Sequence, residues 1–412
     1  MLNKNNEREL AYLVRVEDIT PMDADRLECA HIAGWKIVCG KGELHPGDVA
    51  VYFEIDSQLP DVEPFSSMEF LRSKKFKIKS QKIRGVVSQG LLVPVTAFGW
   101  QTICDDKKIS INVYDNDGNH HCLDDESRFL TKQLNVTYAS PEDNSRKASS
   151  IDKYKRMAQR RPNIFKHKWA QWFMRRNWGK KIMFFFFGKK KDNKTGWPAW
   201  VKKTDEERIQ NCPWMLLQDK EWIATEKIDG SSTTFTMKGF GRKRQFFVCS
   251  RNVVFDKPDK KCYYDTNIYT EMAEKYHMEE IMGKMLDSAD NPEIDFLTIQ
   301  AETYGAGIQK RTYGLEGHDM AIFNIIWGYK DGKTVRLNPE VGQKVAMYWE
   351  LPYVPVLGRT KLPKDCDSVL EIASSDVSKI DGGMREGIVF RSLDGKDSFK
   401  AVSNEYLLKY HG

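Results

Sequence analysis

The chain has 412 residues, which suggests two or three domains rather than one. Hydrophobic residues make up 41% and charged residues 30% of the sequence, and no apolar run approaches the roughly 20 residues of a membrane helix, so we expect no membrane partner. The eight cysteines form no C-x-x-C pair, which argues against a zinc ribbon or a disulfide scaffold. Because the first residues are polar and charged, we expect no secretory signal and an intracellular, cytoplasmic location, with a nuclear or organellar one left open.

The net charge of +6 is unevenly distributed along the chain. Residues 146–203 contain 19 Lys and Arg but only two acidic residues, so the rest of the chain is net acidic. A concentrated basic block on an otherwise acidic protein indicates a polyanionic partner.

Residues 1–135 read as a β-rich domain. Short apolar stretches at 49–55, 76–79 and 90–95 alternate with turn signals such as the His-Pro-Gly-Asp sequence at 45–48. Several short strands at close spacing predict a small β-barrel, of which the OB-fold is the common form.

One stretch of this domain has a strand-like period of two. Lys75, Lys77 and Lys79 alternate with Phe76 and Ile78, so the lysines would face outward and the apolar side chains inward. A lysine face on a small barrel is suited to RNA binding along the phosphate backbone. The alternative is a solvated edge strand that its lysines protect from aggregation.

Residues 136–200 form a basic, aromatic-rich insert or linker. Tryptophans and phenylalanines, including Phe184 to Phe187, are interleaved with Lys and Arg. This is the composition of sequence-tolerant nucleic-acid binding, in which cations contact phosphates and rings stack on bases. The alternative is a helical insert whose aromatic side chains pack on a neighbouring surface.

Residues 201–412 read as one mixed α and β domain. The T-x-x-E sequence at 204–207 has the form of a capping box and predicts a helix start. Periodicity predicts further helices over 268–285 and 368–380, and Ser403 is suited to cap a last short helix. Strands are predicted at 222–226, 233–237, 245–249, 296–302, 320–327, 387–391 and 398–402.

The first chemical signal is Lys227-Ile228-Asp229-Gly230, a lysine followed by a carboxylate and a glycine. A lysine can act as a nucleophile when nearby cations or burial lower its pKa. Four further groups follow in order, each at the end of a predicted strand or inside one: Ser250-Arg251-Asn252, Glu302 with the glycine-containing loop to Lys310, Ile322-Phe323-Asn324, and Arg385-Glu386-Gly387 with Phe399-Lys400-Ala401.

The order and character of these groups resemble the covalent nucleotidyltransferase superfamily, and among its members the ATP-dependent RNA ligases. The stretches at 226–232, 203–211 and 307–310 all look RNA-ligase-like, whereas DNA ligases and capping enzymes usually carry arginine where this chain has Ser232. The resemblance is strong over 201–410 and weaker over 1–135, where the barrel resembles the N-terminal module of nick-sealing RNA ligases. It implies an α+β protein: a ligase-type nucleotidyltransferase domain of antiparallel sheets flanked by helices, preceded by an OB-like barrel.

The resemblance also implies roles for individual residues. Lys227 would attack the α-phosphate of ATP, Asp229 would orient the site, and Lys400 would neutralise phosphate charge. Glu386 would lie near the metal, Mg²⁺ or Mn²⁺. The residues that would bind the nucleotide are Glu226, Lys227, Glu302, Phe323, Glu386 and Lys400. The residues that would bind RNA are Arg251, Gln309 and Lys310. The barrel lysines Lys75, Lys77 and Lys79 are further candidates from their sequence pattern alone.

One departure from the family pattern matters. Val402 stands where a second lysine is often found, so Lys400 would act alone or with a remote lysine. Phe390 is an alternative to Phe323 as the residue that stacks on adenine. The implied activity is ATP-dependent joining of 3′-hydroxyl and 5′-phosphate RNA ends, at nicks in duplexes or in RNA/DNA hybrids, by a monomer. The alternatives are a GTP-dependent capping-type enzyme, a DNA ligase, and a nucleic-acid-binding protein without catalysis.

Overall fold

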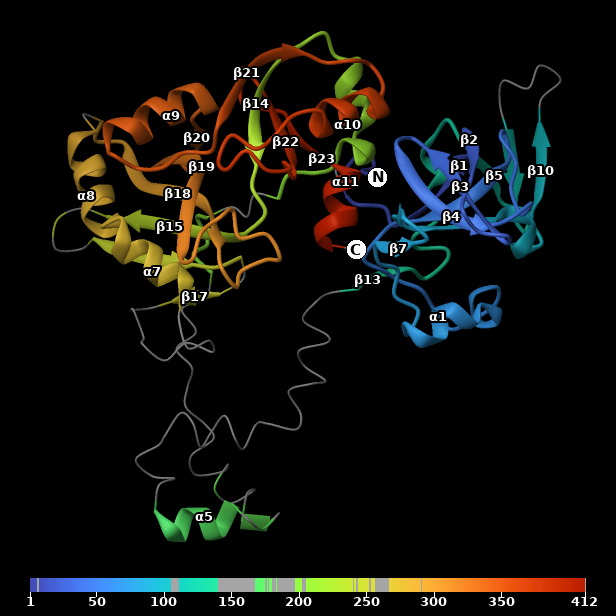
Figure 1. The fold of residues 1–412 in the computed structure, drawn as a ribbon, viewed down its shortest axis with the longest axis horizontal. Helices are drawn as coiled ribbons and strands as arrows, with labels where there is room; N and C mark the ends of the chain where they lie inside the picture. The colour runs from blue at the N-terminus through green and yellow to red at the C-terminus, as the bar shows by residue number, and fades with distance from the viewer. Residues whose placement is uncertain are drawn as a thin grey trace.

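The protein is described by a computed structural model (Figure 1). It describes residues 1–5, 7–104, 111–139, 167–174, 176, 178–179, 183, 197–201, 205–239, 241, 244–251, 253–255, 267–289 and 291–411. Most of the basic insert, the tetraphenylalanine run and Thr204 lie outside the described residues.

The N-terminal part of the chain is built from short antiparallel strands and two short helical segments before residue 75. Strand β5 lies between β1 and β9, and β2, β3 and β4 form a three-stranded meander. The Val38 amide donates to the Ser88 hydroxyl over 3.0 Å, which links β4 to β8. The elements are β1 (Ala11–Arg15), β2 (Asp18–Pro21), β3 (Leu27–Ile32), β4 (Trp35–Gly40), β5 (Val49–Phe53), β6 (Ser57–Gln58), η1 (Phe65–Ser67), α1 (Glu69–Ser73), β7 (Gln81–Ile83), β8 (Val86–Ser88), β9 (Leu91–Pro94), η2 (Val95–Phe98), β10 (Gln101–Cys104), β11 (Ile111–Tyr114), β12 (His120–Cys122), η3 (Glu126–Arg128) and β13 (Thr137–Tyr138).

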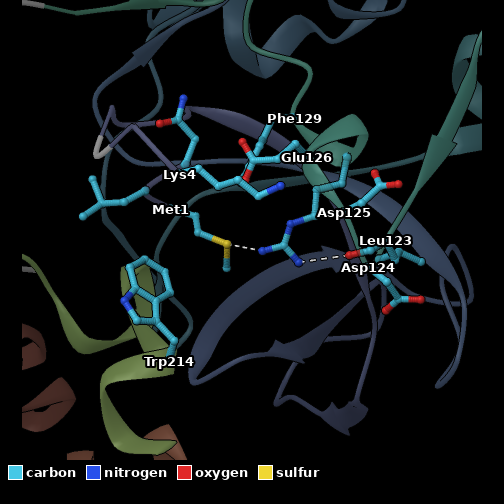
Figure 2. Close-up of a pocket in the computed structure, with 11 residues that line it drawn as sticks. Met1, Lys4, Leu123, Asp124, Asp125, Glu126, Phe129 and Trp214 are labelled. Carbon is cyan, nitrogen blue, oxygen red and sulfur yellow. Dashed lines mark hydrogen bonds between the residues drawn. The ribbon is translucent and has the colours of Figure 1, made fainter. Parts of the chain in front are cut away.

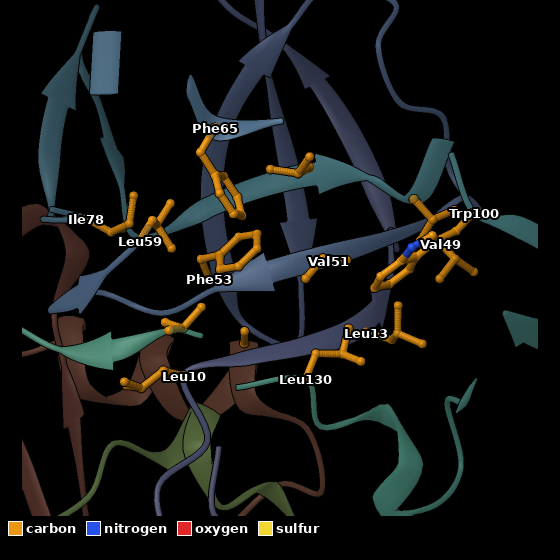
Figure 3. Packing of buried hydrophobic residues seen from close by; sticks show 14 of the residues in the cluster. Leu10, Leu13, Val49, Val51, Phe53, Leu59, Phe65, Ile78, Trp100 and Leu130 are labelled. Atoms are coloured by element: carbon orange, nitrogen blue, oxygen red, sulfur yellow. The ribbon is translucent and has the colours of Figure 1, made fainter. Parts of the chain in front are cut away.

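Apolar side chains fill both sides of the central strands. One cluster includes Leu13, Val51 and Phe53, with Phe65 packed edge-on to Phe53 at 5.2 Å between ring centroids (Figure 3). A second cluster, on the other side of β1 and β5, contains Tyr12 and Tyr52. Strand β5 is buried along its whole length because both of its faces are covered.

The expected strand at 76–79 is wrong. Lys75 and Phe76 have positive φ values of 53° and 58°, so the chain turns here instead of extending. The expected alternation of burial still holds: Phe76 and Ile78 are buried, and Lys75 and Lys79 are exposed. A turn, rather than a strand, therefore buries the two apolar side chains.

The C-terminal part contains two antiparallel sheets. A four-stranded sheet has the order β21-β14-β22-β23, and a six-stranded sheet has the order β17-β16-β15-β18-β19-β20. Strand β14 of the first sheet leads through the turn at 228–230 into β15 of the second, so this turn lies where the two sheets meet. The strands are β14 (Glu221–Lys227), β15 (Ser231–Lys238), β16 (Gln245–Cys249), β17 (Val254–Phe255), β18 (Ile294–Gly305), β19 (His318–Tyr329), β20 (Thr334–Arg336), β21 (Val356–Lys361), β22 (Gly387–Ser392) and β23 (Ser398–Val402).

Helices cover one face of each sheet (Figure 1). Methionines of α7 and α8, among them Met272 and Met282, pack against β15, β18 and β19, while Val369 and Leu370 of α10 pack against β22 and β23. The helical elements are α5 (Lys168–Met174), η5 (Ile209–Asn211), η6 (Pro213–Leu217), α7 (Ile268–Lys275), α8 (Met278–Ser288), α9 (Pro339–Tyr348), α10 (Cys366–Ser374), α11 (Asn404–Tyr406) and η8 (Leu407–His411).

The structure corrects two helix predictions and confirms a third. The single helix expected over 268–285 is two helices, because His277 adopts the left-handed conformation (φ 47°) between α7 and α8. Residues 205–207 are not helical: the Lys400 amide donates to the Glu207 carbonyl, so this segment runs beside β23. Ser403 caps α11 as expected, accepting from the Tyr406 amide.

The two parts of the chain contact one another through several segments. The Gln210 side chain donates to the Gly34 carbonyl, and the Arg208 guanidinium lies 5.7 Å from the centre of the Trp35 ring. The C-terminal segment lies beside β7 in Figure 1, and Leu407 packs against Val87 of β8. None of the helices in the described part of the chain is long and apolar enough to cross a membrane.

Candidate active site

Lys227 is the last residue of β14, with its neighbours in register on β22. Lys227 pairs with Gly387, which places Glu386 directly beside the lysine side chain. The Lys227 Nζ donates to Glu386 Oε2 over 2.8 Å. The lysine side chain is 24% exposed and the glutamate side chain 9%, so the pair is largely shielded from bulk water.

Glu302 enters the same site from the six-stranded sheet. It lies opposite Ser232 in the β15–β18 pairing and accepts a hydrogen bond from the Gly230 amide. Burial raises the pKa of Glu302 to about 8; Lys227 opposes this shift and Glu386 adds to it. Burial by itself would lower the pKa of Lys227, but the carboxylates of Glu386 and Glu302 outweigh burial, and the pKa of the lysine is raised. The amine is therefore held as an ammonium as long as the Glu386 carboxylate faces it.

Lys400 supplies a second cation close to Lys227. Burial, together with the positive charges of Lys227 and Arg208, lowers the pKa of Lys400 to about 8. Arg208 pairs with Lys400 through an isolated parallel bridge and interacts with the charge of Glu386. Sequence analysis placed Arg208 inside an RNA-ligase-like stretch but gave it no role. Its proximity to Lys400 depends on strand pairing between segments almost 200 residues apart.

The two aromatic candidates for stacking on adenine, Phe323 and Phe390, differ in how deeply they are buried. Phe390 is fully buried and packs against Phe399 at 5.3 Å between ring centroids, so it is a core residue and no candidate for stacking. Phe323 of β19 is only partly buried, beside Ile228 of the nucleophile turn, and its carbonyl accepts from Arg391. Of the two rings, only Phe323 is partly accessible, and it packs in the cluster that contains Ile228, the residue after Lys227.

Glu226 holds a loop of the protein in place. Its carboxylate accepts hydrogen bonds from the Ser378 hydroxyl and, over 2.8 Å, from the Lys379 amide. Both oxygens thus contact the 378–379 loop. This side chain is buried at 2% exposure and braces the end of β14 from the face opposite Lys227.

The turn after Lys227 is fixed from three directions. The Asp229 amide donates to the Tyr313 hydroxyl over 2.7 Å, and the Asp229 carboxylate accepts from Tyr406 over 3.0 Å. The Gln309 side chain, which sequence analysis assigned to RNA, donates to the Gly230 carbonyl over 3.1 Å. Nothing in the sequence pattern indicated Tyr313 or Tyr406, because their role depends on tertiary contacts.

The other residues expected to bind RNA lie around the site and on the N-terminal part. Arg251 is exposed and pairs with Asp205 over 2.6 Å. Lys310 is exposed in the loop after β18. Lys75 and Lys79 are exposed and Lys77 is half-buried in the turn that precedes β7.

The described piece of the basic insert combines cations and rings. Trp172 of α5 and Trp178 are about half exposed, and their rings meet edge-on at 6.0 Å. The Arg176 guanidinium lies 3.7 Å from the centre of the Trp172 ring. These contacts occur within the insert itself.

One pocket lies away from these residues, between the N-terminal segment and η6 (Figure 2). Met1, Arg128, Phe129 and Trp214 are among the residues that line it, and the Arg128 guanidinium contacts the Met1 sulfur. Its lining includes none of the predicted catalytic residues. Among the described residues, no group of three or more His, Cys, Asp or Glu side chains could hold a metal ion.

Comparison with known proteins gives this geometry a family context. The RNA ligase family model matches residues 220–411, and a model described as an OB-fold domain matches residues 10–95. The protein is thus an α+β protein with an RNA ligase domain of antiparallel sheets and helices, preceded by an OB-fold domain. This confirms both the predicted fold class and the resemblance on which it was based. A search of curated proteins found no match.

Solved structures of an RNA ligase from Naegleria gruberi share the architecture. The structure with PPi is 24% identical, with a TM-score of 0.62 over 98% of this chain and 99% of that chain. A variant with ATP and Mn is 25% identical, with a TM-score of 0.61 over 98% and 100%. A variant with AMP and Mn is also 25% identical, with a TM-score of 0.62 over 98% and 99%.

Proposed function

We propose that this protein is an ATP-dependent RNA ligase that joins 3′-hydroxyl and 5′-phosphate ends at nicks in RNA duplexes or RNA/DNA hybrids. It would act in RNA repair, as a monomer. The observation that carries the proposal is the convergence of Lys227, Glu302, Glu386 and Lys400 at the junction of the two sheets of an RNA ligase domain.

The first step is transfer of AMP from ATP, a substrate of the reaction, to Lys227. The Lys227 Nζ attacks the α-phosphorus, a nitrogen–phosphorus bond forms, and the bond to the β-phosphate oxygen breaks to release pyrophosphate. Lys400 and Arg208 would offset the negative charge on the phosphates. The N. gruberi ligase has been solved with ATP and Mn, with AMP and Mn and with PPi, which supports the same substrate here.

Before it attacks, the Lys227 amine must lose its proton. Glu386 and Glu302 raise its pKa in the present arrangement, so the hydrogen bond to Glu386 has to be released. The proton would then pass to solvent, to which the Lys227 side chain is 24% exposed. Glu386, together with phosphate oxygens of the nucleotide, would hold Mg²⁺ or Mn²⁺, which fits carboxylate chemistry. The metal would supply neutralisation of phosphate charge.

The remaining nucleotide contacts follow from position. Phe323, partly exposed in the cluster that contains Ile228, would stack on adenine, and Glu302 would accept hydrogen bonds from the ribose. The side chain of Glu226 is occupied by the 378–379 loop, so its contribution to the nucleotide site is to hold the end of β14 in place. Asp229 orients the turn through its own hydrogen bonds.

Two further transfers complete the reaction. An oxygen of the RNA 5′-phosphate attacks the phosphorus of the lysyl-AMP and Lys227 leaves, giving an RNA–adenylate. The 3′-hydroxyl then attacks the 5′-phosphate, forms the phosphodiester and expels AMP. Arg251 and Lys310, exposed near the site, are the candidates that hold the 5′-phosphate.

The domains would divide the work. Residues 201–412 would carry the chemistry, and residues 1–135 would bind RNA through Lys75, Lys77 and Lys79. The insert at 136–200, with Arg176 over Trp172, would contact phosphates and bases. RNA affinity should therefore fall steeply as the salt concentration rises, because Lys and Arg side chains that contact phosphates release counter-ions from RNA.

The test is incubation with Mg²⁺ and ATP or GTP labelled at the α-phosphate, followed by denaturing electrophoresis of wild type and Lys227→Ala. We expect label from ATP on wild type only. Label from GTP instead would favour a capping-type enzyme. No label on folded protein shown to be free of bound AMP would contradict the ligase mechanism and favour a non-catalytic nucleic-acid-binding protein. Sealing of nicked RNA against nicked DNA then separates an RNA ligase from a DNA ligase.

A further inference from the structure

We propose that Tyr406 is a positioning residue for the nucleophile turn, and that through it the docking of the OB-fold domain controls the reactivity of Lys227. The proposal rests on the proposed function, because the rate of Lys227 adenylation is the property it concerns. It assigns a role to the C-terminal segment Ser403–His411, which no motif of the sequence indicated.

A hydrogen bond joins the C-terminal segment to the nucleophile turn. The Tyr406 hydroxyl donates to Asp229 Oδ2 over 3.0 Å. Tyr406 is fully buried and Asp229 is 6% exposed, so water is largely excluded from this contact. A hydrogen bond to a buried carboxylate is among the stronger ones in proteins. Asp229 is two residues after Lys227, so a shift of its side chain changes the direction of the nucleophile.

Hydrogen bonds of Ser403 hold Tyr406 next to Glu386. The Ser403 amide donates to the Glu386 carbonyl over 2.8 Å, and the Ser403 hydroxyl accepts from the Tyr406 amide. The Arg311 guanidinium lies 4.1 Å from the centre of the Tyr313 ring and 5.9 Å from that of Tyr406. The same short helix thus connects the backbone at Glu386 with the turn after Lys227.

The same segment also contacts the OB-fold domain. Leu407, directly after Tyr406, is 9% exposed and packs against Val87 of β8 and against Val402. The Lys82 Nζ of β7 donates to the Leu408 carbonyl over 3.5 Å. Val402, which stands where the family often has a second lysine, serves here as an apolar seat for this docking.

These contacts form one continuous chain from the OB-fold domain to the nucleophile. When Val87 is docked on Leu407, the α11 turn is fixed and the Tyr406 hydroxyl reaches Asp229. When the OB-fold domain moves away, Leu407 loses its cover, the segment is free to shift, and the Asp229 carboxylate loses this donor. Adenylation of Lys227 would then be fastest in the docked arrangement.

The test is the single-turnover rate of self-adenylation with ATP labelled at the α-phosphate, measured over a range of ATP concentrations. For Tyr406→Phe, which removes only the hydroxyl, we expect the maximal rate to fall at least about tenfold, since a hydrogen bond to a charged group is worth that much or more. The half-saturating ATP concentration should stay the same, because Tyr406 contacts the turn and not the nucleotide. Tyr348→Phe, at a tyrosine that is 79% exposed, is the matched control and should behave as wild type.

Two further variants test the route of the effect. If Tyr406 acts through Asp229, Tyr406→Phe combined with Asp229→Asn should be no slower than the slower single variant. Val87→Ser, in the OB-fold domain, should lower the maximal rate without changing half-saturation. If Tyr406→Phe does not fold, Val87→Ser tests the proposal in the same assay.

Each opposite outcome overturns a stated part of the proposal. A folded Tyr406→Phe protein with the wild-type rate would overturn the positioning role, and so would additive losses in the double variant. Wild-type behaviour of Val87→Ser would overturn the control by domain docking. A wild-type protein that takes no label would instead contradict the proposed function, so the two failures are distinguishable.

Discussion

A methyl group added at Gly230 should slow the self-adenylation of Lys227 while the protein remains folded. A Cβ atom built on Gly230 would lie 2.3 Å from the Thr303 carbonyl oxygen and 3.0 Å from Glu302 Cγ. The carbonyl belongs to the inner strand β18 and cannot swing away, so the turn itself must move. Ordinary contact begins near 3.4 Å, so Gly230→Ala requires a displacement of about 1 Å, close to Lys227 and to the amide that donates to Glu302.

A misplacement of that size in an active site costs about a hundredfold in rate, while crowding a packed site typically costs about 1–3 kcal/mol of folding free energy. We therefore expect Gly230→Ala to remain folded, with a lowered melting temperature, and to self-adenylate about a hundredfold more slowly. Single-turnover labelling with α-labelled ATP measures the rate, and thermal unfolding checks the fold. Gly317→Ala is the matched control, because nothing lies within 4 Å of its Cβ position. Wild-type labelling by Gly230→Ala would refute the placement of the turn.

Three further outcomes follow from the site. Binding of an ATP analogue that cannot be cleaved between the α- and β-phosphates should weaken as pH rises through about 8, where Lys400 loses its proton. Lys400→Arg should reduce this dependence, leaving the part that the ionisation of Glu302 contributes. The pKa of Glu302 is about 8 in the folded protein against 4.5 for a free glutamate, so raising the pH between these values favours the unfolded chain. The melting temperature of Glu302→Gln, measured relative to that of wild type, should therefore increase as pH rises from about 5 to 8. Phe323→Ala should weaken ATP binding by about 1–3 kcal/mol, the value of one base stacked on an aromatic ring.

Each of these outcomes has a result that would contradict it. An analogue affinity that is constant from about pH 7 to pH 9, on both sides of the Lys400 pKa of about 8, would contradict the role of Lys400. A constant difference in melting temperature between Glu302→Gln and wild type would show that Glu302 ionises normally. For Phe323→Ala, unchanged ATP affinity would exclude stacking, and Phe129→Ala, in the pocket away from the site, serves as the control.

The sequence was informative where chemistry depends on residues close together in the chain. The order of Lys227, Glu302, Phe323, Glu386 and Lys400 was sufficient to predict a nucleotidyltransferase of the RNA ligase type, and the family match over 220–411 confirms the resemblance. Strands β14, β15, β16, β22 and β23 were each predicted within one or two residues, because they are apolar segments bounded by clear turns.

Local patterns failed where tertiary contacts determine the backbone. The period of two at 75–79 predicted a strand, but burial of Phe76 and Ile78 is satisfied by a turn. The periodicity over 268–285 is continuous in the sequence, yet His277 breaks the helix in two. A capping-box sequence predicted a helix at 204–207, whereas Glu207 pairs with the edge of β23 instead.

The sequence by itself determined which residue types carry the chemistry, in which order they occur, and that a β-rich domain precedes them. Only the tertiary structure decided that Glu386 holds Lys227 by a hydrogen bond, that Phe390 is core while Phe323 is accessible, and that Gln309 braces the turn. It also brought Tyr406 onto Asp229 and Val87 onto Leu407. The physical reason is that strand order and domain packing join segments tens to hundreds of residues apart, and such contacts leave no periodic or local signal in the sequence.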